Sequence, residues 1–330
     1  MMASDDLDEP YAQYSEQFEP RAPKRKAPRS HKRTPPRAEA VSELAETSGM
    51  EAGFVTTYVP ARYEEIWLRD SLRPFYDEHL IVDVLSQVKG GKEASVYCCT
   101  ADPSTGTARL AAKVYRPRMF RNLRNDAVYR EGRAILTAEG RAAKKTDHRL
   151  MRAVGKKTAF GAQVSHTSWV MHEYTTMERL YAAGAAVPKP YAAAENGILM
   201  EYIGDEQRAA PALNEISLPR RVAYPLFQEI LRTIELLLQH ALAHGDLSAY
   251  NILFWEGRAV LIDFPQVVAL SANRQAKAIL QRDITRVCEY FARQGVRANA
   301  STITNDMWAR YGAAIDDDLA ALFEPPAQIE

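Results

Sequence analysis

Three short runs rich in β-branched residues, at positions 80–88, 94–99 and 109–115, place the strongest constraint on the fold of this chain. Two turns separate these runs, KGGKE at 89–93 and DPSTG at 102–106. Strand-like runs joined by short turns that contain glycine and proline predict neighbouring antiparallel strands. We therefore expect a small antiparallel sheet in the first half of the chain.

The second half shows helical periodicity instead. Apolar residues recur every three or four positions between 226 and 238, directly after Pro225, which is the spacing of a buried helix face. We also expect a helix at 63–72 that ends at Arg73-Pro74, and one from Ser168, as its N-cap, to about residue 183. A strand at 198–203 and a hairpin at 252–263 complete the pattern. The expected fold class is α+β, a small sheet with one main helix followed by a mostly helical lobe.

The charges are segregated, although Lys+Arg and Asp+Glu both total 42. Residues 1–20 carry six acids and no base, residues 21–37 carry eight bases and no acid, and residues 109–157 hold fifteen Lys and Arg against four acids. We interpret residues 1–50 as a disordered tail and residues 120–165 as a basic flexible insertion. The basic half of the tail and residues 109–157 are candidates for RNA contact through phosphate neutralisation, or are simply solvated.

The overall composition indicates a folded protein of the cytoplasm. The chain is 46% hydrophobic and 25% charged, as ordinary globular proteins are. Its three cysteines form no CxxC motif, which favours a reducing compartment. No apolar run approaches the roughly 20 residues of a membrane helix, and the acidic start does not resemble a signal peptide. We expect no contact with a membrane.

Three oxygen-bearing side chains are expected to converge near the hairpin. Asp246 lies in a loop before it, Asn251 follows five residues later, and Asp263 ends its second strand. Carboxylate and amide oxygens are suitable ligands for Mg²⁺, which takes its remaining ligands from water and phosphates. Taken singly, each of these residues could instead stabilise a turn.

A second group of residues suits a phosphate ligand. Gly90 and Gly91 allow backbone N–H groups to approach phosphate oxygens, although paired glycines also form ordinary turns. Lys113 lies in an otherwise apolar strand, and Glu173 shares a helix face with Met177. A buried charge needs a partner, so we expect Lys113 and Glu173 to pair.

Six motifs and one later helix carry a resemblance to a known family. They are KGGKEASVY (89–97), AKVY (112–115), WVMHE (169–173), LMEYIG (199–204), HGDLSAYN (244–251), IDFPQ (262–266) and RDITRVCEYF (282–291). In this order they resemble the RIO family of atypical serine/threonine protein kinases. The resemblance implies a two-lobed protein-kinase-like fold with a helical extension at 51–79, an N-lobe at 80–204 and a C-lobe at 205–330.

The resemblance also implies roles for individual residues. Lys113, paired with Glu173, would hold the α- and β-phosphates of ATP, and Asp246 would accept the proton of the attacking hydroxyl. Asn251 and Asp263 would bind Mg²⁺ or Mn²⁺, and Asp263 could itself become phosphorylated. Further nucleotide contacts are implied in the glycine turn and in the hinge between the lobes. They are Gly90, Gly91, Lys92, Glu93, Ala94, Ser95, Val96, Met200, Glu201, Tyr202 and Ile203.

The expected activity is ATP- and Mg²⁺-dependent transfer of the γ-phosphate to Ser or Thr hydroxyls of a protein or ribonucleoprotein, to Asp263, or to both. One alternative is a small-molecule phosphotransferase of the aminoglycoside or choline kinase type, in which a second His usually follows HGDL where this chain has Ser248. Another is an ATP-gated assembly factor in which water acts on phosphorylated Asp263. The chain also departs from the RIO pattern at Lys89-Gly90, where the family often has Ser-Thr.

Overall fold

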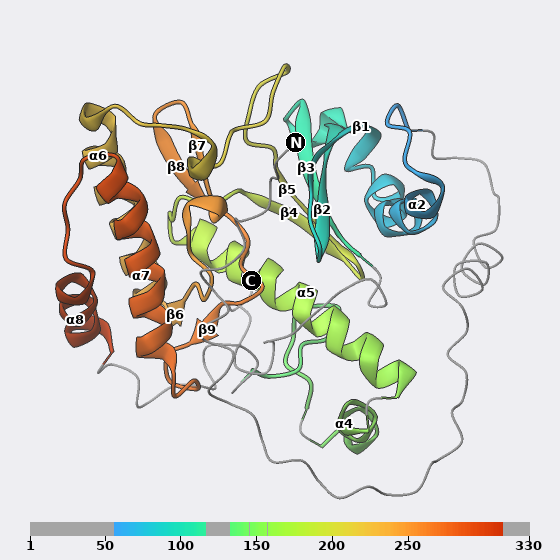
Figure 1. The fold of residues 1–330 in the computed structure, drawn as a ribbon. Coiled ribbons are helices and arrows are strands. Elements are labelled where there is room, and N and C mark those ends of the chain that lie inside the picture. The colour runs from blue at the N-terminus through green and yellow to red at the C-terminus, as the bar shows by residue number, and fades with distance from the viewer. Residues whose placement is uncertain (1–55, 117–132, 145, 157, 313–330) are drawn as a thin grey trace, which may run out of the picture. The chain divides into compact units, whose positions relative to one another are not determined.

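A five-stranded antiparallel sheet precedes a mainly helical region in the described part of the chain (Figure 1). The computed structural model describes residues 56–116, 133–144, 146–156 and 158–312. The predicted tail at 1–50, with its RNA contact, lies outside these residues, as do residues 120–132, 145 and 157 of the predicted insertion.

The sheet has the strand order β1-β2-β3-β5-β4, and every neighbouring pair is antiparallel. Lys113 lies on the central strand β3, opposite Val96 of β2 and Ile198 of β5. The three strands predicted first are present, whereas β4 was not predicted because its PYAAA sequence has no β-branched residue. The strands are β1 (Ile81–Gly90), β2 (Ala94–Ala101), β3 (Arg109–Tyr115), β4 (Pro190–Ala194) and β5 (Gly197–Glu201).

Helix α2 (Arg62–Asp77) packs on the sheet through side chains such as Leu68 and Phe75, which are almost completely buried. The prediction that this helix ends before Pro74 was wrong, because the helix continues for three more residues. A proline removes one helical N–H donor. Burial of Phe75 in the sheet core favours the extra turn and offsets that loss.

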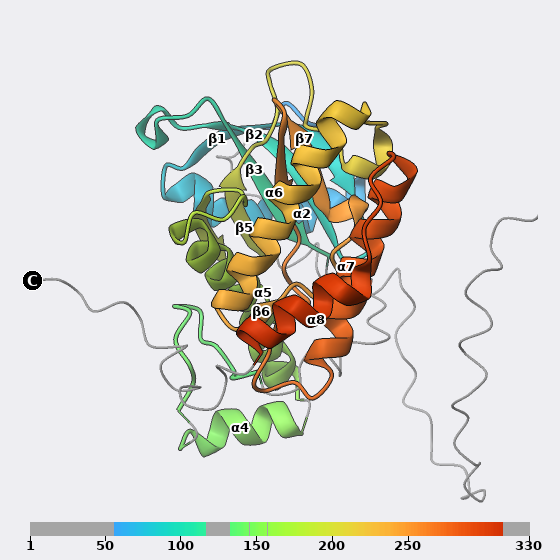
Figure 2. The ribbon, with the colours of Figure 1, turned by 90° about the vertical axis from the view of Figure 1, so that its left-hand side faces the viewer.

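Helix α5 (Ala159–Ala182) lies against β4 and β5. Its N-cap is Thr158, so the prediction of Ser168 as the cap was wrong. Ser168 is buried within the helix, and its hydroxyl accepts a hydrogen bond from the backbone N–H of Leu136. A short helix, α4 (His148–Gly155), precedes α5 and packs against it (Figure 2).

Three helices, two short sheets and short 3₁₀ segments make up the second region. Figure 2 shows α7 beside α6 and α8, and the rings of Phe227 and Phe291, 5.2 Å apart, join α6 to α7. No helix in the described ranges has the length and hydropathy to cross a membrane. The elements of this region are α6 (Arg220–Gln239), β6 (Leu242–Ala243), β7 (Ile252–Trp255), β8 (Arg258–Leu261), β9 (Val268–Ala269), α7 (Ala276–Arg293), α8 (Ala300–Tyr311), and the 3₁₀ segments η4 (Leu213–Glu215) and η5 (Ala249–Asn251). A further 3₁₀ segment, η2 (Pro103–Thr105), lies between β2 and β3 of the first sheet.

Strand β6 pairs with β9, and β7 pairs with β8. The loop that joins β6 to η5 contains Asp246, and the segment that joins β8 to β9 contains Asp263. The two pairings therefore hold these two loops side by side, facing the sheet.

Candidate active site

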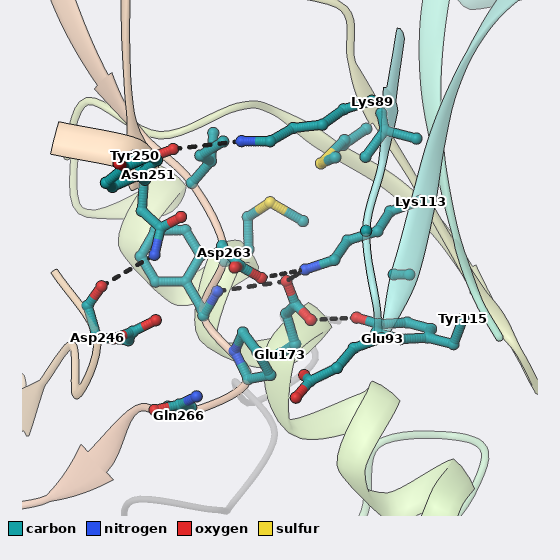
Figure 3. Close-up of a pocket in the computed structure, with 18 of the residues that line it drawn as sticks. Lys89, Glu93, Lys113, Tyr115, Glu173, Asp246, Tyr250, Asn251, Asp263 and Gln266 are labelled. Atoms are coloured by element: carbon teal, nitrogen blue, oxygen red, sulfur yellow. Dashed lines mark hydrogen bonds and ion pairs between the residues drawn. The ribbon is translucent and has the colours of Figure 1, made fainter. Parts of the chain in front are cut away.

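A cavity of about 800 Å³ lies between the sheet and the helical region (Figure 3). Residues of the β1–β2 turn, β3, α5 and the loops around the β7–β8 hairpin line it. The predicted site residues in its lining are Gly91, Lys92, Glu93, Ala94, Val96, Lys113, Glu173, Met200, Asp246, Asn251 and Asp263.

Five predicted nucleotide contacts are not among the described residues that line this cavity: Gly90, Ser95, Glu201, Tyr202 and Ile203. Ser95 has no exposed surface. Glu201 is exposed, and its carboxylate accepts a hydrogen bond from the backbone N–H of Lys189. The backbone carbonyl of Ile203 accepts the N–H of Ala210. Their contacts with a nucleotide stay predictions.

The ammonium group of Lys113 lies between two carboxylates (Figure 3). Its Nζ is 2.5 Å from Oε1 of Glu173 and 2.6 Å from Oδ1 of Asp263. The pairing of Lys113 with Glu173 that the sequence predicted is therefore present. Burial opposes the charged form of Lys113, but Asp263 and Glu173 outweigh it and raise its pKa.

The two carboxylates respond differently to this shared partner. Burial raises the pKa of Glu173, which is only 3% exposed, even though Lys113 acts in the opposite direction. Desolvation also acts to raise the pKa of Asp263, but Lys113, with smaller contributions from His244 and Lys89, outweighs it and the pKa is lowered. Asp263 therefore stays ionised at neutral pH, and its side chain is 40% exposed towards the cleft.

Glu173 is held by two further donors. The hydroxyl of Tyr115 donates to Oε2, and the backbone N–H of Phe264 lies 3.3 Å from Oε1. Glu173 thus joins the sheet, through Lys113 and Tyr115, to the segment that follows Asp263. The sequence did not assign Tyr115 a role, although it lies two residues from Lys113 on the same face of β3.

The loop before the hairpin brings Asp246 and Asn251 to the same cavity as Asp263. The side-chain amide of Asn251 donates to the backbone carbonyl of Asp246 at 2.9 Å, and the backbone carbonyl of Asn251 accepts the N–H of Ile262 at 3.0 Å. The convergence that the hairpin predicted is present.

His244 joins the two loops as a neutral imidazole. Its Nε2 is 3.1 Å from the carbonyl oxygen of Ile262, and its Nδ1 is 3.3 Å from the backbone N of Asp246. In this pattern Nε2 carries the ring proton and donates it to the carbonyl of Ile262 in a hydrogen bond, while the unprotonated Nδ1 accepts a hydrogen bond from the N–H of Asp246. Burial lowers the pKa of His244, which favours the neutral ring.

The backbone at this junction is unusual at two positions. Gly245 has φ of +87°, and a Cβ there would lie 2.1 Å from the carbonyl oxygen of Gln266, so only glycine fits. Asp263 has φ of +72°, a conformation that non-glycine residues adopt rarely and mostly at functional sites.

The family model described as RIO domain matches residues 127–304, which are 178 of the 330 residues of the chain. The chain belongs to the RIO domain family. The resemblance that the motifs predicted is therefore confirmed. The matched range includes Glu173, Asp246 and Asp263, whereas Lys113 and the glycine turn precede it.

Relatives of this RIO protein include two proteins named as kinases. The RIO-type serine/threonine-protein kinase Rio1 of Haloferax volcanii is 34% identical over 137 residues, which cover 41% of this chain and 46% of that protein. The serine/threonine-protein kinase RIO1 of Chaetomium thermophilum is 26% identical over 234 residues, covering 67% of this chain and 41% of that protein. The chain thus spans less than half the length of these relatives.

A solved structure of Rio2 kinase from Chaetomium thermophilum, an ADP/Mg²⁺-phosphoaspartate complex, has a fold similar to this one. The TM-score is 0.54 at 19% identity, and the alignment covers 86% of this chain and 77% of that chain. This likeness concerns the fold alone. It confirms the predicted two-lobed α+β kinase fold.

Helix α7 of this RIO protein contacts the Asp246 loop through residues to which the sequence reasoning gave no role. Asp283 is 2% exposed and accepts the backbone N–H groups of Gly245 and Leu247 at 2.8 and 3.2 Å. Burial raises its pKa to about 7, although these N–H groups act in the opposite direction. Arg286 binds the side chain of Asp246. Asp283, like Glu173, is a carboxylate on an apolar helix face, and this pattern is the signal by which the sequence could have marked it.

Lys89 marks the departure of this chain from the RIO turn sequence. Its side chain reaches across the cavity mouth, and Nζ lies 3.5 Å from the backbone carbonyl oxygen of Tyr250 (Figure 3). A second ammonium group therefore stands near Lys113 and Asp263. Its charge contributes to the lowered pKa of Asp263.

The cavity fits a nucleotide with a divalent cation. Its volume is within the range of small-molecule sites. The ammonium groups of Lys89, Lys92 and Lys113 supply positive charge for phosphates, and Asn251 and Asp263 supply the oxygen ligands that Mg²⁺ prefers. At Gly91, a Cβ would lie 2.7 Å from the carbonyl oxygen of Ala94, so the turn needs a residue without a side chain.

Proposed function

We propose that this RIO protein is an ATP- and Mg²⁺-dependent kinase or ATPase that transfers the γ-phosphate to Ser or Thr hydroxyls, to its own Asp263, or to both. The observation that carries the proposal is the position of Lys113, between Glu173 and Asp263 in the cavity that Asp246 also lines. The kinase names of the relatives and the ADP/Mg²⁺-phosphoaspartate complex of Rio2 support it.

The proposed roles follow the chemistry of each side chain. Lys113 would neutralise charge on the α- and β-phosphates, and Asp246 would accept the proton of the acceptor hydroxyl. Asn251 and Asp263 would hold Mg²⁺ or Mn²⁺, which would neutralise phosphate charge and orient the transferred group. Met200 would contact the adenine ring from the hinge side of the cavity.

Transfer to Asp263 is a balanced substitution at phosphorus. A carboxylate oxygen of Asp263 would attack the γ-phosphorus, the bond from phosphorus to the β–γ bridging oxygen would break, and ADP would leave. Water would later hydrolyse the acyl phosphate, returning the carboxylate and inorganic phosphate. The 40% exposure of the Asp263 side chain to the cleft favours this branch, and with it the ATP-gated assembly factor as a second candidate function.

Binding and transfer measured on two variants test the assignment. Asp246→Asn and Asp263→Asn should both reduce phosphoryl transfer to a small residual rate, because each removes a carboxylate that acts in it. Only Asp263→Asn should greatly weaken Mg²⁺–ATP binding in calorimetric titration, since Asp263, unlike Asp246, is a proposed ligand of the cation. Equal losses of binding in the two variants would contradict the assigned roles.

The whole-protein features are also proposals. We propose a tail at 1–50, an extension at 51–79, an N-lobe at 80–204 and a C-lobe at 205–330, in a cytoplasmic protein that acts on a protein or ribonucleoprotein. The described part of the basic segment 109–157 supports RNA contact, because a shallow hollow beside α4 is lined by basic side chains including Arg149, Arg152 and Lys156. Deletion of residues 1–50 should leave ATP affinity unchanged and reduce salt-sensitive RNA binding; unchanged RNA binding would contradict the proposed role of the tail.

A further inference from the structure

Helix α7 binds the Asp246 loop with three side chains on one face. Arg282 donates to the backbone carbonyl of Gly245, Asp283 accepts two backbone N–H groups of the loop, and Arg286 binds the carboxylate of Asp246. Residues separated by three or four positions lie on the same side of a helix. The first two side chains fix the loop backbone, and Arg286 alone of the three contacts the side chain at its centre.

The contacts of Asp246 leave one of its oxygens for another partner. Nη1 of Arg286 lies 2.8 Å from Oδ1. The backbone carbonyl of Asp246 accepts the amide of Asn251, and its backbone N–H faces His244. Within the described residues, Oδ2 of Asp246 has no hydrogen-bond partner. The residue is therefore held at its backbone and at one oxygen, while its second oxygen remains available in the cavity.

The exposure of the ion pair indicates that it orients the carboxylate of Asp246 and contributes little to the stability of the fold. The side chains of Arg286 and Asp246 are 40% and 39% exposed. Ion pairs this exposed contribute little to folding, because water screens the attraction and two side chains lose conformational freedom. A charge-assisted hydrogen bond from the planar guanidinium group nevertheless fixes the direction of a carboxylate.

We propose that Arg286 is a positioning residue for phosphoryl transfer, which binds Oδ1 of Asp246 and thereby directs Oδ2 towards the hydroxyl of the acceptor. This inference rests on the proposed function and adds a residue to it. Arg286 itself does not touch ATP or the acceptor. It acts by lowering the freedom of the carboxylate, and small errors in the placement of a reacting group are costly to rate.

The central test compares Arg286→Met with a matched variant of the same helix, Lys277→Met. Lys277 is exposed in the first turn of α7 and outside the cavity lining. Arg286→Met should lower kcat by about 10- to 100-fold, with KM for ATP and the unfolding midpoint close to wild type. Lys277→Met should change none of these quantities. An unchanged kcat in Arg286→Met would overturn the proposal.

Two further measurements separate positioning from a general effect of charge. Arg286→Lys should recover only part of the kcat lost in Arg286→Met, since an ammonium group lacks the planar fork of a guanidinium group. Millimolar guanidinium should partly restore the kcat of Arg286→Ala, whereas the same concentration of sodium should not. Full recovery by Lys, or equal effects of the two cations, would contradict orientation by the guanidinium group.

A double substitution identifies the residue through which Arg286 acts. In the Asp246→Asn background, the residual transfer rate should fall by less than twofold when Arg286→Met is added, because the carboxylate to be oriented is already absent. A further loss as large as in the wild-type background would show that Arg286 acts elsewhere. If the wild-type chain transfers no phosphate from ATP, the proposed function itself fails, whereas an active wild type with an unaffected Arg286→Met refutes only the positioning role.

Discussion

Replacing Lys113 by Met tests the electrostatic centre of the site through protein stability. The substitution keeps a long apolar stem and removes the ammonium that lies 2.5 Å from Glu173 and 2.6 Å from Asp263. Two carboxylates then remain without their shared cation, and Glu173, at 3% exposed, has little access to water. We expect the folded state to lose stability and Glu173 to take up a proton at a higher pH.

The expected size follows from the burial of the pair. Removing one partner of a buried ion pair costs about 3–5 kcal/mol. Most of this cost falls on Glu173, because Asp263 is 40% exposed and can be hydrated. The pKa of Glu173 is already raised by burial and rises further without Lys113. A raised pKa in the folded state adds stability at low pH that is lost as pH rises through that pKa. The loss of stability in Lys113→Met should therefore be greatest near pH 8. As the pH is lowered from the pKa of Glu173 in the variant to its pKa in the wild type, this loss should decrease by about 1.4 kcal/mol per pH unit.

These free energies can be measured by urea unfolding at pH 8 and pH 5.5. The proteins to compare are the wild type, Lys113→Met and Lys113→Met/Glu173→Gln. The double variant should regain about 2 kcal/mol or more at pH 8, because Gln leaves no buried charge and still accepts from Tyr115. A loss below about 1 kcal/mol in Lys113→Met at both pH values, or no recovery in the double variant, would refute the reasoning.

Two other predictions concern residues near the site. Burial lowers the pKa of His172 from 6.5 to about 4, and Nε2 lies 2.7 Å from the carbonyl oxygen of Ala134. The ring is neutral in the folded state and takes up a proton more readily in the unfolded state. Its contribution to the free energy of unfolding is therefore present above pH 6.5 and is lost as the pH falls towards 4. The stability advantage of the wild type over His172→Gln should shrink by about 3 kcal/mol between pH 7.5 and 4 in urea unfolding; a difference independent of pH would contradict the neutral buried ring. Lys89→Ser, which replaces the ammonium group by a hydroxyl, should weaken Mg²⁺–ATP binding several-fold at low salt and less at high salt, as measured by titration calorimetry. If the variant binds as tightly as the wild type at both salt concentrations, Lys89 does not reach the phosphates.

The parts of the fold that were predictable are those in which local sequence and tertiary environment agree. The strands around the glycine turn combine β-branched runs with turn residues, and all three are present as β1, β2 and β3. Ser168 misled the prediction of α5 because a serine hydroxyl can serve a neighbouring segment as well as a helix end, and here it bonds Leu136. The α2 helix passes Pro74 because Phe75 is buried by the sheet, and no local signal contains that information.

The site shows the same division between local and tertiary information. Pairing of Lys113 with Glu173 could be predicted, since a charge in an apolar strand and another on an apolar helix face each need a partner. The second partner of Lys113, Asp263, could not be predicted from spacing because it depends on how the β8 end meets the sheet. Arg286 lies at a half-buried helix position, where arginine is ordinary, and only the contact with Asp246 gives it significance.

The most direct test of phosphoryl transfer uses Mg²⁺ and γ-labelled ATP with the purified chain, Asp246→Asn and Asp263→Asn. We expect the wild type to acquire label or to release labelled phosphate, and both variants to lose this activity. Label that hydroxylamine removes would indicate an acyl phosphate on Asp263, whereas hydroxylamine-stable label would indicate Ser or Thr. A wild-type chain that binds Mg²⁺–ATP but neither becomes labelled nor releases phosphate, or an Asp263→Asn variant as active as the wild type, would contradict the account.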